Sequence, residues 1–310
     1  MFSVIFPGQG SQLVGMGKEF YNKFDLSKRL FKEADETLGF SLSKLILEGP
    51  KEELDLTENT QPAIFLLSYM IFQLTKKEFN IDLSKAKYFA GHSLGEYSAL
   101  ASAEVLSFSD TIKILKIRGK AMQNSVPKGE GGMVAVLGST IEIIQNIINE
   151  NSNKYECFIA NDNSEGQIVV SGSTLELEKF MKDLKLNKIK NIKLPVSAPF
   201  HCKLMNNASE IMKNEIDKMN FKEPKNILIS NVTGKEISNV SELKRLLVKQ
   251  IESRVRWRES VLLMINNGIN QFIEIGPGQV LSGFIKRIDK NIKISAINNE
   301  EDISTININD

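Results

Sequence analysis

The residues best suited to covalent chemistry lie in the segment Gly91-His92-Ser93-Leu94-Gly95, which contains the pattern Gly-x-Ser-x-Gly. An apolar, strand-like run precedes the pattern and a helix-like run follows it. In that context the serine sits on a sharp strand-to-helix turn, where its hydroxyl is exposed for nucleophilic attack. The alternative is a loop serine that only caps the following helix. The segment therefore indicates a serine nucleophile at position 93.

A serine hydroxyl is a weak nucleophile and needs a base within hydrogen-bond reach, most often a histidine. The chain has two histidines. His92 adjoins Ser93, and adjacent side chains on such a turn diverge, so His92 is a poor base. His201 is the expected general base, its alternative being a purely structural histidine. The residues alone leave open which group orients His201, although a backbone carbonyl can accept from its Nδ1–H.

An acyl-transfer reaction also needs preorganised donors for the oxyanion that forms at the attacked carbonyl. The backbone N–H of Leu94, directly after the nucleophile, is one candidate. A glycine-rich turn, Pro7-Gly8-Gln9-Gly10, follows the first apolar run and can present backbone N–H groups to an anion. Gln9 is therefore the expected source of the second donor, and a flexible connection is the plainer alternative for this turn.

The elements that must position these residues alternate between strands and helices. Strands are expected at 3–6, 88–90, 226–229, 271–275 and 292–297, with helices between them. This alternation predicts an α/β fold, a mostly parallel, hydrolase-like sheet covered by helices. Among the helices, one is expected from Gln61-Pro62 to about Phe79, with Pro62 in its first turn. Ser109-Asp110 is expected to cap a helix over 111–124, and the polar tail from Asn298 is expected to fray.

Between two proline- and glycine-rich breaks the order of elements changes. Strands at 133–137, 157–160, 167–171 and 192–196 and helices at 140–149 and 174–184 make a β-α-β-β-α-β, ferredoxin-like pattern. The sequence thus predicts a large catalytic domain from residues 1–127 and 199–310, with a small α+β domain inserted at 128–198. Five lysines gather near the end of this insertion: Lys182, Lys185, Lys188, Lys190 and Lys193.

Composition limits the partners. The 310 residues are 42% hydrophobic and 25% charged with a net charge of +1, which gives no basic field for nucleic acid. No cationic leader or membrane-spanning run is evident, so a cytoplasmic protein without a membrane partner is expected. Cys157 and Cys202 make no disulfide framework. With so few histidines and cysteines, no metal site is expected.

Several motifs in register resemble the malonyl-CoA:acyl-carrier-protein transacylases over almost the whole chain. The motifs are Phe6-Pro7-Gly8-Gln9-Gly10-Ser11-Gln12, Gly91-His92-Ser93-Leu94-Gly95-Glu96-Tyr97, Arg118-Gly119 with Met122-Gln123, Pro199-Phe200-His201, and Glu274-Ile275-Gly276-Pro277-Gly278. The resemblance implies an acyltransferase of fatty acid biosynthesis that works by a ping-pong malonyl-serine mechanism. Its implied partners are malonyl-CoA and acyl carrier protein. No cofactor is implied, because coenzyme A is the carrier of the acyl donor, and a monomer is expected.

The resemblance also implies roles for individual residues. Ser93 and His201 would be catalytic, and Gln9 and Leu94 would supply the oxyanion N–H groups. Three residues would line the substrate pocket: Arg118, Gln61 and Phe200. Arg118 would hold the malonyl carboxylate, whereas on helical spacing alone it reads as a snorkelling surface arginine. Phe200 would narrow the pocket toward malonyl.

The family further has a glutamine whose backbone carbonyl orients the histidine, and Gln250 matches it, ahead of Val255-Arg256-Trp257. Arg254 stands where relatives commonly have proline, so a less rigid loop is expected there.

Two other functions remain open from the sequence. A serine hydrolase, such as a thioesterase or esterase, would use the same nucleophile, base and oxyanion hole, but has no need of a carboxylate clamp such as Arg118. A non-catalytic module that binds carrier protein would need none of these residues. The lysines of the insertion fit either a docking face for an acidic carrier protein or a solvated surface.

Overall fold

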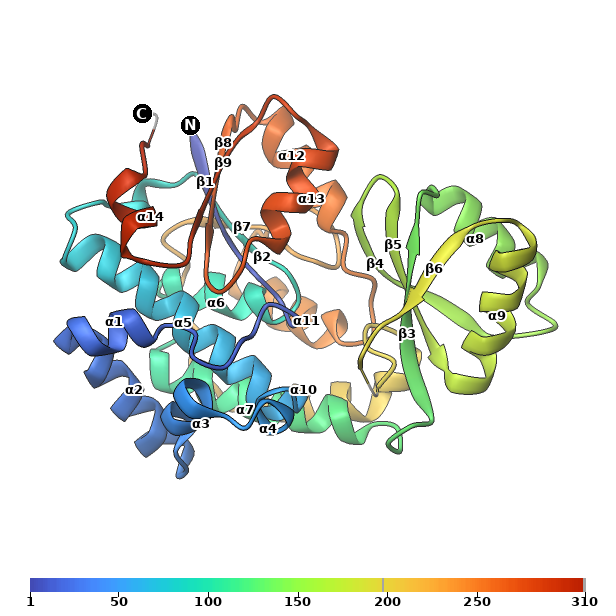
Figure 1. The fold of residues 1–310 in the computed structure, drawn as a ribbon, viewed down its shortest axis with the longest axis horizontal. Coiled ribbons are helices and arrows are strands. Elements are labelled where there is room, and N and C mark those ends of the chain that lie inside the picture. Colours follow the sequence, from blue (N-terminus) through green and yellow to red (C-terminus); the bar gives the residue numbers. More distant parts are fainter. Residues whose placement is uncertain (197, 309–310) are drawn as a thin grey trace.

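We describe a computed structural model that covers residues 1–196 and 198–308. Two bodies lie side by side, a larger one with both chain ends and a smaller one built from the middle of the chain (Figure 1). Within the described ranges, none of the helices is both long enough and apolar enough to cross a membrane.

A five-stranded parallel sheet forms the centre of the larger body, in the order β7-β2-β1-β8-β9. Its strands are β1 Phe2–Phe6, β2 Tyr88–Gly91, β7 Ile227–Leu228, β8 Gln271–Ile275 and β9 Lys293–Ile297. Every residue of β1, β2 and β8 is buried, as expected for parallel strands covered on both faces. The predicted α/β class is thereby confirmed.

Alternate residues of β1 enter different hydrophobic cores, because successive side chains of a strand point to opposite faces. Val4 and Phe6 pack with α5 (Thr57–Lys77) and α6 (Leu94–Ser102). Ile5 packs instead with α12 (Trp257–Asn266) and α13 (Val280–Ile288). The remaining helices of this body are α1 Lys18–Lys23, α2 Asp25–Leu38, α3 Leu42–Glu48, α4 Lys51–Leu54, α7 Phe108–Asn124, α10 Asn206–Lys218, α11 Val240–Gln250 and α14 Glu300–Thr305, with short 3-10 turns η1 Leu83–Lys85 and η2 Lys203–Met205.

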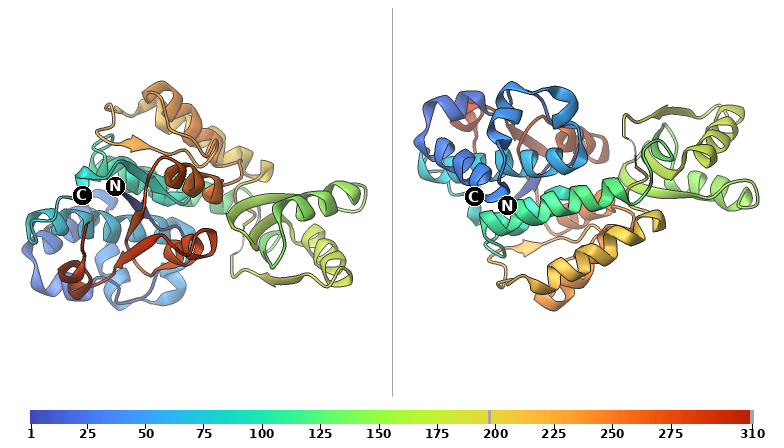
Figure 2. Two further views of the ribbon diagram at one scale, coloured as in Figure 1. Left: turned by 90° about the horizontal axis from the view of Figure 1, so that it is seen from above. Right: turned by 90° about the horizontal axis from the view of Figure 1, so that it is seen from below.

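The smaller body contains a four-stranded antiparallel sheet in the order β4-β5-β3-β6. Its strands are β3 Gly131–Leu137, β4 Cys157–Ser164, β5 Gln167–Ser173 and β6 Lys190–Lys193. The helices α8 (Ile141–Glu150) and α9 (Thr174–Leu186) pack together with one face of the sheet in a separate hydrophobic core. Figure 2 shows this body projecting from one side of the larger one in both further views. The predicted β-α-β-β-α-β order is confirmed, while the domain boundaries at 127/128 and 198/199 stay predictions.

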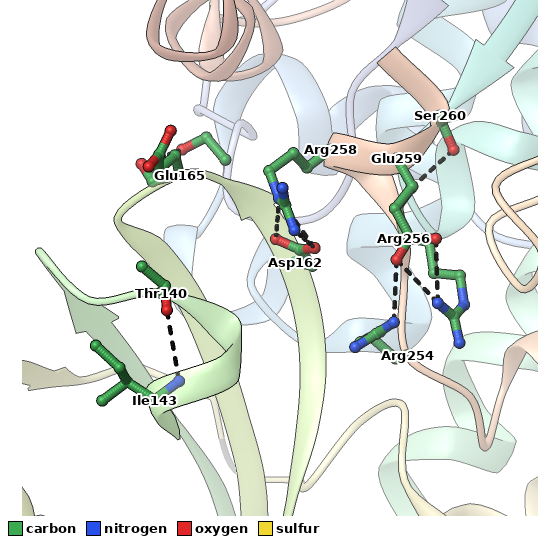
Figure 3. A network of polar contacts seen from close by, with 10 residues as sticks. Thr140, Ile143, Asp162, Glu165, Arg254, Arg256, Arg258, Glu259 and Ser260 are labelled. Atoms are coloured by element: carbon green, nitrogen blue, oxygen red, sulfur yellow. Dashed lines mark hydrogen bonds and ion pairs between the residues drawn. The ribbon is translucent and has the colours of Figure 1, made fainter. Parts of the chain in front are cut away.

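The two bodies are joined where β4 meets the loop before α12. The N–H of Val255 donates to the carbonyl of Ala160 at 2.8 Å, and the N–H of Asp162 donates to the carbonyl of Val255 at 2.9 Å. Arg258 donates to both carboxylate oxygens of Asp162 at 3.0–3.1 Å (Figure 3). The side chain of Asp162 is only 1% exposed and that of Arg258 is 28% exposed, so the contact pairs a half-buried guanidinium fork with a buried carboxylate between the bodies.

The last strand of the smaller body, expected at 192–196, lies at Lys190–Lys193. Three expected features of the larger body are also wrong in detail. The long helix begins at Thr57 rather than at Gln61, because the N–H groups of Asn59 and Thr60 already donate to the carbonyl of Leu56. Pro62 therefore lies inside α5.

The other two corrections concern helix ends. Ser107, and not Ser109-Asp110, caps α7 by accepting from the N–H of Asp110. The tail after Asn298 is not frayed throughout, because Asn299 and Asp302 form a reciprocal capping box that starts α14.

Candidate active site

Ser93 lies at the sharp turn between β2 and α6, with φ 55° and ψ −109°. A side chain at either flanking glycine would collide with backbone. A Cβ on Gly91 would lie 2.0 Å from the carbonyl carbon of Gly95, and a Cβ on Gly95 would lie 2.2 Å from the carbonyl oxygen of Phe6. The two glycines thus allow strand and helix to approach, and the turn holds Ser93 in a backbone conformation that non-glycine residues rarely adopt.

The structure brings Ser93, His201 and Gln250 into one line of hydrogen bonds. Ser93 Oγ lies 2.8 Å from His201 Nε2. His201 Nδ1 lies 2.9 Å from the backbone carbonyl of Gln250, the last residue of α11. Because a carbonyl only accepts, Nδ1 carries the proton and Nε2 is left as the acceptor for the serine hydroxyl. His201 also has a positive φ of 61°, so both members of the pair sit on strained backbone.

The surroundings of His201 keep its imidazole neutral. Burial lowers the pKa of His201 to about 3, and the nearby positive charge of Arg118 acts in the same direction. The hydrogen bond to the Gln250 carbonyl opposes this shift but does not outweigh it. A neutral imidazole is the form that can take a proton from a hydroxyl.

Arg118 is fully buried, at 0% exposure, and its guanidinium faces the nucleophile. Nη1 donates to Gln61 Oε1 at 2.8 Å, and Nη2 donates to Gln250 Oε1 at 2.7 Å and to Ser93 Oγ at 3.1 Å. The guanidinium carbon lies 5.5 Å from the centre of the Tyr97 ring. All three acceptors are neutral, so no carboxylate within residues 1–196 and 198–308 bonds directly to this cation, which is suited to receive one from a ligand.

Close packing of α7 on the start of α5 brings Arg118 to this position. A Cβ on Gly119 would lie 2.5 Å from the carbonyl oxygen of Thr57. Only glycine fits at that contact, so the Arg118-Gly119 pair noted in the sequence combines a charged group with the residue that lets its helix approach.

Gln9 and Leu94 follow neighbouring parallel strands, since β1 pairs with β2 through Phe6 and Gly91. The turn that carries Gln9 lies against the serine turn: a Cβ on Gly8 would lie 2.8 Å from the carbonyl oxygen of His92. Leu94 is the first residue of α6, so its N–H is one of those that no carbonyl of the helix can accept. Both backbones therefore lie beside the serine turn. The Gln9 side chain donates to Thr57 Oγ1 at 3.3 Å.

Phe200 directly precedes His201 in the chain, and Gln61 lies on α5. Phe200 is 7% exposed, and its carbonyl accepts a 2.6 Å hydrogen bond from Ser171 Oγ on β5. The residue before His201 is thus fixed to the smaller body. Gln61, on α5, bonds directly to Arg118 and is also buried.

Two residues at the site were not assigned from the sequence. Asn231 accepts from the N–H of Ser93 at 2.7 Å and donates to the carbonyl of Gly91 at 2.7 Å, so it clamps the strained turn from both sides. Glu96 accepts from Gln250 Nε2 at 2.6 Å and from the N–H of Asn231 at 3.2 Å. The sequence feature that could have revealed Glu96 is that it is the only charged residue in α6. Asn231 could have been noticed as a polar residue shortly after a strand.

The loop between α11 and α12, where Arg254 led us to expect less rigidity, is well bonded. The N–H of Ser253 donates to the carbonyl of Gln250 at 3.3 Å, and the N–H of Arg256 donates to that of Asn231 at 2.9 Å. Arg254 itself bonds to Glu259 at 3.0 Å, as Figure 3 shows. Together with the two backbone bonds of Val255, these contacts hold the segment that carries the Gln250 carbonyl.

His92 turns away from the nucleophile, as expected for a neighbouring side chain. Its Nε2 lies 2.8 Å from Asn163 Oδ1 on β4, and burial lowers its pKa to about 4. In the part of the chain that the structure describes, no group of three or more His, Cys, Asp or Glu side chains is arranged to hold a metal ion. The geometry thus offers a serine with a neutral histidine, fixed N–H groups and a buried guanidinium, which together suit transfer of an acyl group that carries an anion.

The chain is similar over nearly its whole length to known acyl transferases. The family model described as "Acyl transferase domain" matches residues 3–304. The malonyl CoA-acyl carrier protein transacylase of Bacillus subtilis strain 168 is 42% identical over 303 residues, which cover 96% of this chain and 94% of the relative. The enzyme of the same name from Escherichia coli K12 is 36% identical over 96% of both chains. The crystal structure of acyl-carrier-protein-S-malonyltransferase from Bartonella henselae is 41% identical, with a TM-score of 0.94 over 98% of this chain and 97% of the other.

Proposed function

The chain belongs to the acyl transferase domain family, with the activity of an acyl-carrier-protein S-malonyltransferase of fatty acid biosynthesis, and we propose that Ser93 carries the malonyl group. The substrates are malonyl-CoA and the phosphopantetheine thiol of acyl carrier protein. One observation carries the proposal: the Oγ of Ser93 is hydrogen-bonded at once to His201 Nε2 and to the buried Arg118 Nη2. The first contact supplies the base and the second an anchor for a carboxylate.

In the first half-reaction, His201 Nε2 takes the proton of Ser93 Oγ while Oγ attacks the thioester carbonyl of malonyl-CoA. The resulting oxyanion is held by the backbone N–H groups of Gln9 and Leu94. When the tetrahedral intermediate collapses, the bond from carbon to sulfur breaks and the coenzyme A thiolate takes the proton from His201. The enzyme is left as the malonyl ester of Ser93.

The second half-reaction repeats these steps with the carrier thiol. His201 takes the thiol proton, the sulfur attacks the ester carbonyl, and Ser93 Oγ leaves and regains the proton. The backbone carbonyl of Gln250 keeps the proton of His201 on Nδ1, so Nε2 is free to shuttle the other proton in both directions.

Arg118 gives the site its preference for malonyl. A guanidinium and a carboxylate form two parallel hydrogen bonds, and an acetyl group leaves that cation without an anionic partner. Gln61 supports Nη1 of the guanidinium. Phe200, buried beside His201, limits the room for a larger, branched acyl group.

The direct test is mass spectrometry of the intact protein after incubation with malonyl-CoA. We expect an added malonyl group on the wild-type protein, mapped to Ser93, and none on Ser93→Ala. An adduct on another residue, or full transfer by Ser93→Ala, would overturn the proposal and revive a non-catalytic binding module.

The competing function is hydrolysis, because a serine hydrolase uses the same nucleophile and base. Labelled malonyl-CoA given with and without carrier protein separates the two. Transfer predicts a stable malonyl-enzyme that releases its label only when carrier is added. Rapid formation of free malonate without carrier would instead assign a thioesterase.

The docking face for the carrier protein is tested by charge reversal. Lys182, Lys185, Lys188, Lys190 and Lys193 are all exposed on the smaller body. Docking there predicts that exchanging three of them for glutamate raises the KM for carrier protein and flattens its salt dependence. An unchanged salt dependence would assign these lysines to solvated surface, with docking elsewhere.

We further infer a monomer that acts in the cytoplasm. For the monomer, support comes from the site itself, because one chain brings nucleophile, base and carboxylate anchor together without a second copy. Light scattering at assay concentration tests the monomer, and cell fractionation tests the location.

A further inference from the structure

The side-chain amide of Gln250 lies between a buried cation and a buried carboxylate. Its Oε1 accepts from Arg118 Nη2 at 2.7 Å. Its Nε2 donates to Glu96 Oε2 at 2.6 Å and to the backbone carbonyl of Ser93 at 3.1 Å. One amide therefore has its oxygen on the guanidinium and its nitrogen on the carboxylate.

This arrangement fixes which way round the amide lies. Turning the amide by 180° would place Oε1 against the carboxylate of Glu96 and the NH₂ group against the guanidinium of Arg118. Both contacts would then be repulsive, and two hydrogen bonds to charged groups would be lost. Without Glu96, the contacts with Arg118 Nη2 and with the carbonyl of Ser93 would still favour this orientation, but the amide nitrogen would lose its shortest hydrogen bond, the one to the carboxylate.

The orientation matters because Oε1 of Gln250 is one of two side-chain amide oxygens that hold the guanidinium. Gln61 Oε1 holds Nη1 and Gln250 Oε1 holds Nη2, which leaves the guanidinium facing Ser93 Oγ. If the amide turned, its NH₂ group would repel Nη2 and displace the group on which recognition of a carboxylate depends.

We infer that Glu96 is a positioning residue for malonyl recognition: it holds the amide of Gln250 and thereby aims the guanidinium of Arg118 at the acyl group on Ser93. The inference rests on the proposed function, in which Arg118 binds the malonyl carboxylate. Glu96 does not touch the reacting atoms itself.

The burial of Glu96 and the donors around its carboxyl group support this role. Glu96 is 2% exposed in a helix whose other residues are small or apolar. Burial raises its pKa to about 7, while the hydrogen bonds from Gln250 and Asn231 and the charge of Arg118 oppose that rise. A buried carboxylate of this kind needs donors close by, and two of the donors it has belong to residues that hold the serine turn.

Glu96 acts on Arg118 through the side chain of Gln250, whereas His201 depends on the backbone of Gln250. This difference distinguishes a positioning role of Glu96 from a general loss of structure. His201 is oriented by the backbone carbonyl of Gln250, which a turn of the side-chain amide does not move. Loss of Glu96 should therefore impair use of malonyl more than use of acetyl, since acetyl transfer needs Ser93 and His201 but not Arg118.

The experiment measures kcat/KM for malonyl-CoA and for acetyl-CoA with four variants: Glu96→Leu, Glu96→Gln, Gln250→Leu and the double variant Glu96→Leu/Gln250→Leu. For Glu96→Leu we expect the malonyl-to-acetyl ratio to fall at least about tenfold, because hydrogen bonds to charged groups are lost. Glu96→Gln keeps an acceptor for Gln250 Nε2 and should recover most of the ratio. In the Gln250→Leu background, adding Glu96→Leu should lower the ratio no further.

Glu274→Leu is the matched control. Glu274 is a fully buried carboxylate at the end of β8 that accepts from the N–H groups of Leu281 and Ser282. We expect loss of either Glu274 or Glu96 to lower the melting temperature, because both side chains are buried and hydrogen-bonded, but loss of Glu274 should leave the malonyl-to-acetyl ratio unchanged.

Equal losses with both donors in Glu96→Leu, or additive losses in the double variant, would overturn the inference. The proposed function fails separately, if the wild-type protein shows no malonyl adduct on Ser93 or no preference for malonyl. Glu96→Gln keeps the inference testable even if Glu96→Leu does not fold.

Discussion

Arg118 Nη2 donates a hydrogen bond of 3.1 Å to Ser93 Oγ, so the carboxylate anchor and the nucleophile are in direct contact before substrate arrives. The hydroxyl of Ser93 has one proton and lies 2.8 Å from His201 Nε2. It can donate that proton to the histidine while its lone pair accepts from the guanidinium. The contact places the cation within reach of any short acyl group bound to Oγ.

Replacing Arg118 by alanine should separate malonyl from acetyl transfer. We expect kcat/KM for malonyl-CoA to fall about a hundredfold more than that for acetyl-CoA, because a charged, two-pronged contact is lost. Arg118→Lys keeps the positive charge but not the two-pronged guanidinium, so its preference for malonyl-CoA should lie between those of the wild type and Arg118→Ala. Steady-state assays with both donors measure this, and equal losses with both would remove the carboxylate role.

The stability of the protein should depend on pH through His201. Its pKa is about 3 in the folded chain and near 6.5 when unfolded, so between these values the unfolded chain binds more protons. Stability from this group is therefore complete above pH 6.5 and is lost as pH falls toward 3.

Urea unfolding of the wild type and of His201→Asn at pH 7 and pH 5 isolates this contribution from those of other groups. The stability of the wild type relative to the variant should drop by about 2 kcal/mol between the two values. A constant difference would mean that His201 keeps an ordinary pKa.

The ion pair between the two bodies predicts a large effect from a single charge. Arg258→Leu leaves the carboxylate of Asp162, 1% exposed, without its partner and should cost about 3 kcal/mol of unfolding free energy. Arg256→Leu is the matched control from the same loop. Arg256 pairs with Glu259, and both side chains are more than a third exposed. Loss of this exposed pair should therefore lower the free energy of unfolding by less than about 1 kcal/mol. Denaturant titration measures both, and similar values would contradict the buried pair.

Two helical glycines should respond in opposite directions to alanine. Gly119→Ala forces a methyl group to within 2.5 Å of the Thr57 carbonyl oxygen, and should destabilise the protein by about 1–3 kcal/mol. It should also reduce malonyl use, because Arg118 moves with α7. A Cβ on Gly283 meets nothing within 4 Å, so Gly283→Ala should stabilise α13 by up to about 1 kcal/mol. Thermal melts give the signs, and a neutral Gly119→Ala would show that the helices can separate without loss.

Much of the arrangement followed from local pattern. The strand at Phe2–Phe6 is a short, mostly apolar run that is buried throughout, and the β-α-β-β-α-β pattern predicted the order of strands and helices along the chain in the smaller body. The serine turn could be predicted because Gly91 and Gly95 flank it, and only glycine fits at these two close backbone contacts.

The parts of the site that the sequence did not predict depend on contacts between segments that are far apart in the chain. Glu96, Asn231 and Gln250 meet only when α6, the end of β7 and the end of α11 are packed together, and no local spacing encodes that meeting. The start of α5 was misplaced because Pro62 has the chemistry of a first turn, while backbone bonds from Asn59 and Thr60 to Leu56 begin the helix earlier.

The contact between Ser93 and His201 spans 108 residues, and the whole smaller body lies inside that interval. The entropy lost in closing a loop grows only with the logarithm of its length, so a doubling costs about 0.6 kcal/mol. The catalytic pair therefore tolerates a long interruption of the chain at almost no thermodynamic penalty. The segment between nucleophile and base is therefore a place where a protein of this fold can carry an additional module, provided that the module keeps the contacts that hold Phe200 and Val255.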